Sequence, residues 1–340
     1  MEILRTLEVK GENGHQTPAI LNIYKSSDPL ALCHFELLEG NPLSYNNWLD
    51  LGRLLQTMTH VVAGFETSGI ANFGHTHNIA IAVKHGNPCG AAWGAAEPSS
   101  MIQAMLSGDP ISVFGGSVMV NFHIGEHEAQ FLKRTTLDTI FAPSIDMVAR
   151  EILSRKSGKC RIVCNFNLGR LYKDSLDQKL REVYVRGGEL LQQNYTFVMD
   201  LNHPEMKKYS VQETATRTQE LDMLLAWAIG STSNSNTITL VRNQMLIGNG
   251  AGQQDRVGAA SLAIERAKRS KHEIEGAVAY SDSFFPFPDG PQTLIDAGVK
   301  AILTTSGSMR DQETIDLCME RGVALYMMPD SLARGFFAHT

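Results

Sequence analysis

Short segments typical of β-strands alternate with helical segments along most of this 340-residue chain. The C-terminal part shows the alternation most clearly. Residues 277–283, 299–305 and 323–328 are predicted strands, and residues 291–298 and 311–322 are predicted helices. Two strands joined through a helix normally form a right-handed parallel crossover. The alternation therefore predicts an α/β fold built of layers.

The rest of the chain follows the same pattern, and we divide it into two α/β halves, residues 1–210 and 211–340, although no internal sequence repeat is evident. Residues 46–65 carry apolar side chains at three- and four-residue spacing, which predicts an amphipathic helix capped by Asn46 or Asn47. The other predicted strands are 78–84, 109–122, 139–143, 161–166 and 235–243, the other predicted helices are 99–106, 127–134, 145–156, 218–232 and 259–270, and residues 172–212 are predicted to be poor in strands.

The composition is that of an ordinary globular protein, because 43% of the residues are hydrophobic and 19% are charged. The net charge of −6 argues against a nucleic-acid partner, and no run of about 18 apolar residues suggests a membrane span. The five cysteines do not resemble a disulfide framework, and the N-terminus has no apolar signal segment, so we expect a cytoplasmic protein. Any phosphate would have to be bound by a few well-placed cations.

Lys84 and His85 stand at the end of the predicted strand 78–84, in the segment KHGNPCG. Functional side chains often lie at strand ends in α/β sheets. Histidine moves protons near neutral pH, and lysine offers a point charge to an oxyanion or a phosphate. The alternative is a solvated lysine and a hydrogen-bonded histidine at a turn. We expect this turn to lead into the helix predicted at 99–106.

The segment IGNGAGQQDR (247–256) places three glycines within five residues ahead of Arg256. Such a backbone can present N–H groups to an anion. The segment is neither a GxGxxG nor a Walker motif. A flexible hairpin connection is the alternative.

The segment SDSFFPF (281–287) gathers three aromatic side chains around one proline. These rings could form the wall of a site for a flat heterocycle, and packing in the core is the alternative. Asp282 in this segment could serve as an acid, a base or an ion ligand.

Two short segments, His34-Phe35-Glu36 and His75-Thr76-His77, resemble fragments of a metal or deaminase site. A zinc deaminase would also need Pro-Cys-x-x-Cys. Pro88-Cys89 is present, but Ala92 stands where the second cysteine is needed. We therefore expect no zinc.

Seven segments resemble those of one family and occur in the same order: HQTPA (15–19), LEGNPLSYNNW (38–48), VKHGNPCGAA (83–92), IFAPSI (140–145), SNSNT (233–237), IGNGAGQQDR and SDSFFPF. The family is the AICAR transformylase, the formyltransferase domain of the bifunctional purine enzyme that also carries IMP cyclohydrolase. The resemblance covers almost the entire chain. No cyclohydrolase segment is recognised, so we expect a stand-alone transformylase.

The resemblance implies two cytidine-deaminase-like, three-layer α/β units that are packed as one transformylase module. It also implies a homodimer with active sites at the subunit interface. The implied reaction transfers a formyl group from 10-formyltetrahydrofolate to the 5-amino group of AICAR, in the biosynthesis of IMP. That amine is a poor nucleophile, because its lone pair is delocalised into the imidazole carboxamide. The reaction therefore needs a proton acceptor and donors aimed at the developing charge.

The resemblance also implies roles for individual residues. His85 would take the amine proton, Lys84 would stabilise the tetrahedral intermediate or assist the leaving N10, and Asn236 would hydrogen-bond the formyl oxygen or the carboxamide. The implied AICAR-side residues are Lys10, Phe114, Gly115, Gln254, Arg256 and Arg334, and the implied folate-side residues are Asn87, Asp138, Phe284 and Pro286. A monovalent cation such as K⁺ is implied near Asp282.

One departure from the family concerns phosphate binding. The family's Arg-Tyr-Gly is replaced by Val9-Lys10-Gly11, so one phosphate-contacting arginine is missing and Lys10 is expected to substitute for it. Two other functions remain open: a related formyltransferase that uses formate and ATP, and a non-catalytic homologue that binds AICAR or another nucleotide. No ATP-binding motif supports the first, and the presence of Lys84, His85 and Asn236 argues against the second.

Overall fold

The computed structural model describes residues 2–69, 77–211 and 215–338. Within these residues, twelve strands form the main sheet: β3 (Glu36–Glu39), β4 (Asn78–Lys84), β5 (Asn87–Gly94), β6 (Ser117–Val120), β7 (Thr139–Ala142), β8 (Arg161–Cys164), β11 (Lys207–Tyr209), β12 (Ile238–Arg242), β13 (Met245–Gly250), β14 (Val278–Ser281), β15 (Ala301–Ser306) and β16 (Ala324–Pro329). The α-helices are α1 (Tyr45–Thr67), α2 (Pro98–Ser107), α3 (Pro110–Val113), α4 (Glu126–Leu132), α5 (Met147–Leu153), α6 (Arg217–Gly230), α7 (Arg256–Arg269), α8 (Asp289–Asp296), α9 (Asp311–Glu320) and α10 (Asp330–Ala333). The expected α/β fold is confirmed.

The strand order is β11-β16-β15-β14-β12-β13-β5-β4-β6-β7-β8-β3, and it contains the same pattern twice. In the first half, α1 precedes the antiparallel hairpin β4–β5, β6 pairs antiparallel with β4, and β6, β7 and β8 are parallel. In the second half, α6 precedes the hairpin β12–β13, β14 pairs antiparallel with β12, and β14, β15 and β16 are parallel.

The two halves form one continuous sheet, because β5 lies beside β13 and Ala92 is paired with Met245. An antiparallel strand forms each outer edge, β3 beside β8 and β11 beside β16. The division of the chain at residue 210 stays a prediction, and β11 pairs with β16 before that residue is reached. The repeat is one of topology and not of sequence, which is why no repeat was evident.

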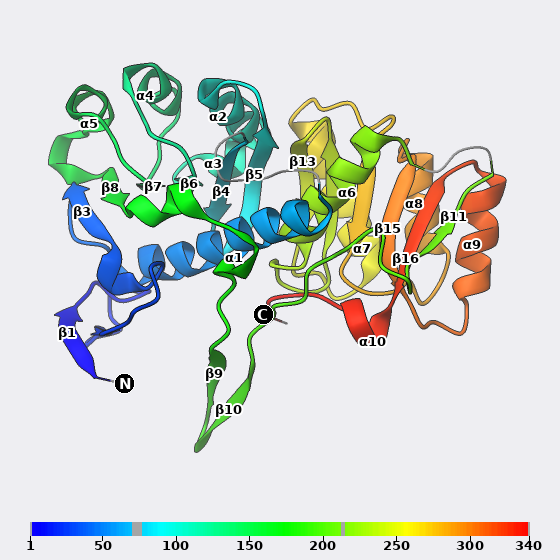
Figure 1. The fold of residues 1–340 in the computed structure, drawn as a ribbon, viewed down its shortest axis with the longest axis horizontal. Coiled ribbons are helices and arrows are strands. Elements are labelled where there is room, and N and C mark those ends of the chain that lie inside the picture. Colours follow the sequence, from blue (N-terminus) through cyan, green and yellow to red (C-terminus); the bar gives the residue numbers. More distant parts are fainter. Residues whose placement is uncertain (1, 70–76, 212–214, 339–340) are drawn as a thin grey trace.

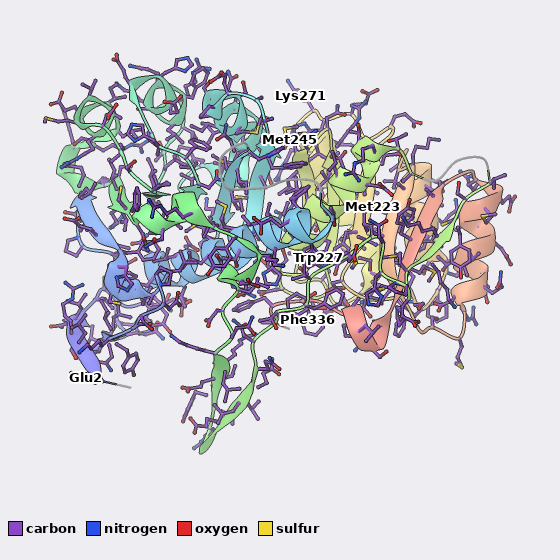
Figure 2. The ribbon with its side chains drawn as sticks, in the orientation of Figure 1. Glu2, Met223, Trp227, Met245, Lys271 and Phe336 are labelled. Atoms are coloured by element: carbon purple, nitrogen blue, oxygen red, sulfur yellow. The ribbon has the colours of Figure 1, made fainter. Side chains whose placement is uncertain are left out.

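Helices cover both faces of the sheet and give three layers (Figure 1). Helices α1 and α6 share one apolar cluster on one face, whereas α2, α4 and α5 and then α7, α8 and α9 contribute to two clusters on the other face. Gly64 lets α1 approach α6 closely, since a Cβ at this position would lie 2.7 Å from the ring of Trp227. Figure 2 shows Trp227 and Met223 of α6 in the middle of the molecule, where both are fully buried.

Two small hairpins lie outside the main sheet: β1 (Ile3–Glu8) with β2 (Ile20–Tyr24), and β9 (Leu180–Val185) with β10 (Gly188–Gln193). Figure 1 shows β9–β10 projecting away from the rest of the fold. Its apolar side chains are largely exposed, with Tyr184 at 80% and Leu190 at 60%. The prediction that residues 172–212 are poor in strands is wrong, because β9, β10 and β11 all lie there.

The segment that follows His85 is strand β5 and not a turn leading directly to a helix, so that prediction is also wrong. The sequence NPCGAAWG lacks the β-branched residues that mark a strand. Its Pro88 stands where the pairing with β4 shifts register, a position that tolerates proline. At Gly90 a Cβ would overlap the carbonyl oxygen of Met105, so the close approach of α2 requires glycine in this strand.

Two further predictions change in detail. Residues 109–122 are not one strand: Asp109 caps the short helix α3 by accepting from the backbone N of Ser112, and only β6 is extended. Helix α1 is capped by Ser44 and not by Asn46 or Asn47, since Ser44 Oγ accepts from the Asn47 backbone N and Asn47 Oδ1 accepts in return from the Ser44 backbone N. Serine at this position with a reciprocal partner three residues later is a capping box.

In the part of the chain that the structure describes, no helix is both long and apolar enough to cross a membrane. His75 and Thr76 of the His-x-His segment lie outside the described residues. Cys89 is buried in β5, where burial raises the pKa of its thiol to about 12.

Candidate functional site

Lys84 and His85 lie at the tight turn between β4 and β5. Lys84 pairs with Asn87 across the hairpin, and the two residues between them, His85 and Gly86, have positive φ values of 52° and 73°. Two central residues of this kind are typical of the type I′ turn that joins short hairpins. The turn therefore fixes the position at which both predicted site side chains leave the sheet.

Asp50, in the first turns of α1, holds this turn in place. Its Oδ1 accepts from the Gly86 backbone N at 3.2 Å, and its Oδ2 accepts from Ser117 Oγ of β6 at 2.9 Å. Burial raises the pKa of Asp50, although both hydrogen bonds and the nearby His85 oppose the increase. The carboxyl group is thus bound on both oxygens and connects α1, the β4–β5 turn and β6.

The turn opens into a cleft of about 940 Å³. Four of the predicted site residues line it, namely Lys84, His85, Gly115 and Asp138. Lys84 Nζ donates to the carbonyl oxygen of Phe114 at 2.6 Å, while 57% of the Phe114 residue is exposed. The cleft has the size of a typical small-molecule site.

Asp138 also lines the cleft and stands immediately before β7. Its Oδ1 accepts from Arg161 Nη1 at 2.7 Å, and its Oδ2 accepts from Asn47 Nδ2 at 2.6 Å. Asn47 Nδ2 also donates to Thr139 Oγ1 at 3.0 Å. A carboxylate held at both oxygens in this way is rigid, and its remaining lone pairs can accept from hydroxyl or amino groups of a ligand.

Arg53 lies one turn beyond Asp50 on α1 and reaches across to the second half of the molecule. Its Nη1 donates to the Thr232 carbonyl oxygen at 3.1 Å, and its Nη2 donates to Asn234 Oδ1 at 2.7 Å. Its guanidinium also lies 3.2 Å from the centre of the Phe337 ring, and Arg181 stacks on the same ring at 4.1 Å. Arg53, Asn234, Phe337 and Arg181 all line the cleft, whereas Thr232 does not.

Asn236 and Arg256 belong to a second cluster, which is centred on Asp282. Arg256 Nη1 donates to Asn236 Oδ1 at 2.8 Å, and its Nη2 donates to Asp282 Oδ1 at 3.1 Å. Asp282 Oδ2 accepts from Ser235 Oγ and from the Thr237 backbone N. Burial raises the pKa of Asp282, against the effect of Arg256, and burial lowers the pKa of Arg256.

The second cluster does not line the cleft, but the segment 234–237 connects the two. Asn234 accepts from Arg53 in the cleft, and its backbone N donates to Asn87 Oδ1 at 3.3 Å. Asn87 Nδ2 in turn donates to the carbonyl oxygen of His85 at 3.4 Å. The structure therefore joins Asn236 to the His85 turn through neighbouring asparagines, and not by direct contact.

Arg334 is paired with Asp330 at 2.7 Å and lies 5.7 Å from the centre of the Phe284 ring. Hydrogen bonds from Thr305 and Ser283, together with Arg334, lower the pKa of Asp330 despite its burial. The predicted residues Lys10, Gln254 and Pro286 are exposed and do not line the cleft. Lys10 lies near the start of α1, where its carbonyl oxygen accepts from the Tyr45 backbone N.

Two of the three glycines in the segment 247–256 lie in a strand, and only Gly252 lies in the loop before α7. Ile247, Gly248 and Gly250 belong to strand β13. A Cβ at Gly248 would overlap the carbonyl oxygen of Ala263, and a Cβ at Gly250 would overlap that of Ala259, so both glycines permit close packing of α7. Among the described residues, no group of three or more His, Cys, Asp or Glu side chains could hold a metal ion.

The cleft contains residues that the sequence did not single out, above all Asp50, Arg53, Arg181, Asn234 and Phe337. One signal was available. Asn47, Asp50 and Arg53 recur every three residues, which places three polar side chains on one face of the amphipathic helix. Arg181 and Phe337 carried no such signal, because they come from segments far away in the sequence.

Comparison with known proteins identifies the family of this chain. The family model described as "AICARFT/IMPCHase bienzyme" matches residues 5–266. The chain is 36% identical over 315 residues to the bifunctional purine biosynthesis protein PurH of Anoxybacillus flavithermus, a match that covers 93% of this chain and 56% of the relative. It is 36% identical to PurH of Prochlorococcus marinus strain NATL2A, with 85% and 53% covered, and 30% identical to PurH of Aquifex aeolicus, with 93% and 56% covered. The chain thus spans a little over half the length of these relatives.

Proposed function

The chain belongs to the AICARFT/IMPCHase bienzyme family, and from this premise we propose that it transfers a formyl group from 10-formyltetrahydrofolate to the 5-amino group of AICAR. The observation that carries the proposal is the Lys84–His85 turn. It places a proton acceptor and a cation on the lining of a cleft of about 940 Å³, and Asp50 holds the turn in position.

In the proposed reaction the AICAR amine attacks the formyl carbon and a new N–C bond forms. His85 accepts the amine proton as this happens, and Lys84 stabilises the negative charge on the formyl oxygen of the tetrahedral intermediate. The bond from the formyl carbon to N10 then breaks, and a proton is delivered to N10 of tetrahydrofolate. Asp138 is placed to accept hydrogen bonds from a bound ligand, because Arg161 and Asn47 fix its carboxylate.

A two-substrate assay tests the proposal. The purified protein is incubated with AICAR and 10-formyltetrahydrofolate, and the formation of tetrahydrofolate and formyl-AICAR is followed. We expect turnover with the wild type and none above background with His85→Ala. Formate with ATP replaces the folate in a parallel reaction. Product formed only from formate and ATP would contradict the folate-dependent proposal, and AICAR binding without turnover from either donor would indicate a non-catalytic homologue.

We also propose that the protein forms a cytoplasmic homodimer with its active sites at the interface. The support is the β9–β10 hairpin, which projects from the fold and exposes Leu180, Tyr184 and Leu190 (Figure 1). A two-stranded hairpin of this kind needs a surface to pack on. Sedimentation velocity should give a dimer for the wild type and a larger monomer fraction for Tyr184→Lys. A wild-type monomer at assay concentrations would contradict this proposal.

A monovalent cation near Asp282 is assigned no step. Both oxygens of Asp282 already accept hydrogen bonds, and a cation bound there would lie beside the guanidinium of Arg256. The residues present therefore fit this ion poorly. Titrating KCl against NaCl in the assay tests whether K⁺ has an effect beyond ionic strength.

A further inference from the structure

Arg53 is a partly buried cation for which the described residues provide no carboxylate within ion-pair distance. Its two printed hydrogen bonds go to neutral oxygens, those of Thr232 and Asn234. A guanidinium has five N–H donors, so some of them remain available to a ligand. Burial, together with the neighbouring Arg181, lowers the pKa of Arg53 to about 9, and Asp50 only partly compensates.

Arg181 adds a second positive charge at the same place. It stacks on Phe337 together with Arg53, and its Nη1 donates to the Phe337 carbonyl oxygen. The two positive charges repel each other, because both guanidinium groups lie against the same ring. A partly buried charge is normally paired with an opposite charge. Two arginines on one ring, both lining the cleft, therefore form a site that an anion would stabilise.

The arginines predicted for phosphate binding differ from this pair. Arg256 is paired with Asp282, and Arg334 is paired with Asp330. Their positive charge is largely neutralised by carboxylates. Lys10, the expected substitute for the missing family arginine, is exposed and does not line the cleft.

Among the described residues, no acidic side chain that lines the cleft forms an ion pair with Arg53 or Arg181. Asp50 accepts from Gly86 and Ser117, and Asp138 is paired with Arg161. Asp177 Oδ1 accepts from the Lys179 backbone N. The fourth acidic residue of the lining, Glu12, is exposed.

We propose that Arg53 and Arg181, held on the ring of Phe337, form an anion subsite that binds the phosphate monoester of the nucleotide substrate. The identity of this ligand rests on the proposed function. The guanidinium forks can each donate two N–H groups to phosphate oxygens. His85 and Lys84 line the same cleft, so the subsite would orient the nucleotide relative to the reacting groups.

Calorimetric titration with two ligands tests the subsite. AICAR and its dephosphorylated riboside are titrated into the wild type, Arg53→Met and Arg53→Lys. Losing charge-assisted hydrogen bonds should weaken AICAR binding by about 10- to 100-fold in Arg53→Met. Binding of the riboside should change by less than about threefold, and Arg53→Lys should recover part of the lost AICAR affinity.

Arg170→Met is the matched control, because Arg170 also stacks on a phenylalanine, Phe166, at 4.3 Å, but lies outside the cleft lining. It should leave AICAR affinity unchanged. Circular dichroism and thermal unfolding establish whether each variant is folded, and Arg53→Lys carries the comparison if Arg53→Met is not. Equal losses for AICAR and the riboside, or no loss for either, would overturn the subsite.

Two more probes distinguish phosphate binding from folate carboxylate binding, and the subsite from the proposed formyl transfer. If Arg53→Met weakens binding of the folate glutamate form but not of AICAR, the subsite takes the folate carboxylate and the phosphate assignment is wrong. Inorganic phosphate should raise the unfolding temperature of the wild type more than that of Arg53→Met. If that difference is found in a protein without formyl transfer, the subsite stands and the proposed function fails. If formyl transfer is found but AICAR affinity does not depend on Arg53, only the subsite fails.

Discussion

The two halves of the sheet contain equivalent hairpin turns, and only one of them opens into the cleft. His85 and Gly86 connect β4 to β5, while Asn243 and Gln244 connect β12 to β13. All four residues have positive φ, between 51° and 73°. The same backbone geometry therefore occurs twice, with different side chains.

Each turn is also held by an aspartate from the helix that precedes its hairpin. Asp50 of α1 accepts from the Gly86 backbone N. Asp222 of α6 accepts from the backbone N of Asn243 at 2.9 Å and from that of Gln244 at 2.7 Å. The second turn faces the junction of the halves, where the Gln244 carbonyl oxygen accepts from the Trp93 backbone N. The difference teaches that the fold provides the same backbone position twice, and that only the side chains at the first position line the cleft.

The largest expected effect separates the two turns by activity. His85→Asn keeps a residue that tolerates positive φ but removes the proton acceptor. Its kcat should fall about 10²- to 10⁴-fold, the usual contribution of general acid–base catalysis. Asn243→Ala, in the second turn, should leave kcat within about twofold. Steady-state formyl transfer measures both, and similar kcat losses in the two variants would refute the assignment of chemistry to the first turn.

The second prediction concerns stability and pH at the second turn. Burial raises the pKa of Asp222 to about 6, from an ordinary value of 3.8, despite its two backbone hydrogen bonds. The folded protein keeps a proton that the unfolded chain loses between about pH 4 and 6, so the free energy of unfolding falls as pH rises through this window. The loss of free energy of unfolding across this window reaches up to about 3 kcal/mol.

Asp222→Asn removes this titration. The free energy of unfolding of the variant should therefore rise, relative to that of the wild type, by up to about 3 kcal/mol as pH rises from 4 to 7. Urea unfolding at several pH values measures the difference. A difference between the two proteins that does not vary with pH would show that Asp222 keeps an ordinary pKa.

The third prediction compares the two supporting aspartates. Asp50→Asn loses one of two acceptor oxygens and should shift the His85 turn, lowering kcat by about 10- to 100-fold. KM should change less. Asp222→Asn should not change kcat by more than about twofold. If both aspartate variants lower kcat equally, Asp50 has only a general structural role.

The smallest effect concerns backbone conformation. Gln244 occupies a left-handed conformation that costs a side-chain-bearing residue about 1–2 kcal/mol. Gln244→Gly should raise the free energy of unfolding by about 0.5–1 kcal/mol, after the greater freedom of glycine in the unfolded chain is included. Activity should be retained. Denaturant unfolding checks the gain, and a clear loss of stability would mean that the Gln244 side chain makes a needed contact.

Strands and helices were predictable where local pattern and tertiary environment agree. Strand β4 was predicted from its Ile and Val residues, and helix α1 from its apolar spacing. Strands β5 and β13 were not, because helices α2 and α7 approach them so closely that glycine replaces the usual strand residues. Hairpin β9–β10 was missed because it has few of the packing contacts that make a strand apolar on one face.

Some residues of the candidate site were also predictable from the sequence, and others were not. Lys84 and His85 were predicted from their motif and Asp138 from the family resemblance, and the structure places all three at one cleft. Arg53 was not identified, since an arginine on the polar face of an amphipathic helix is usually solvated. Its significance depends on Arg181 and Phe337, which lie 128 and 284 residues further along the chain.

The sequence by itself determined the α/β class and the motifs that carry the family resemblance. These follow from hydrophobic periodicity and from short segments, which are local properties of the chain. Only the tertiary structure decided which charges are neutralised and which remain available in the cleft. Whether an arginine meets a carboxylate, as Arg256 does, or another arginine, as Arg53 does, depends on contacts between distant segments, and electrostatic energy depends on those distances and on burial.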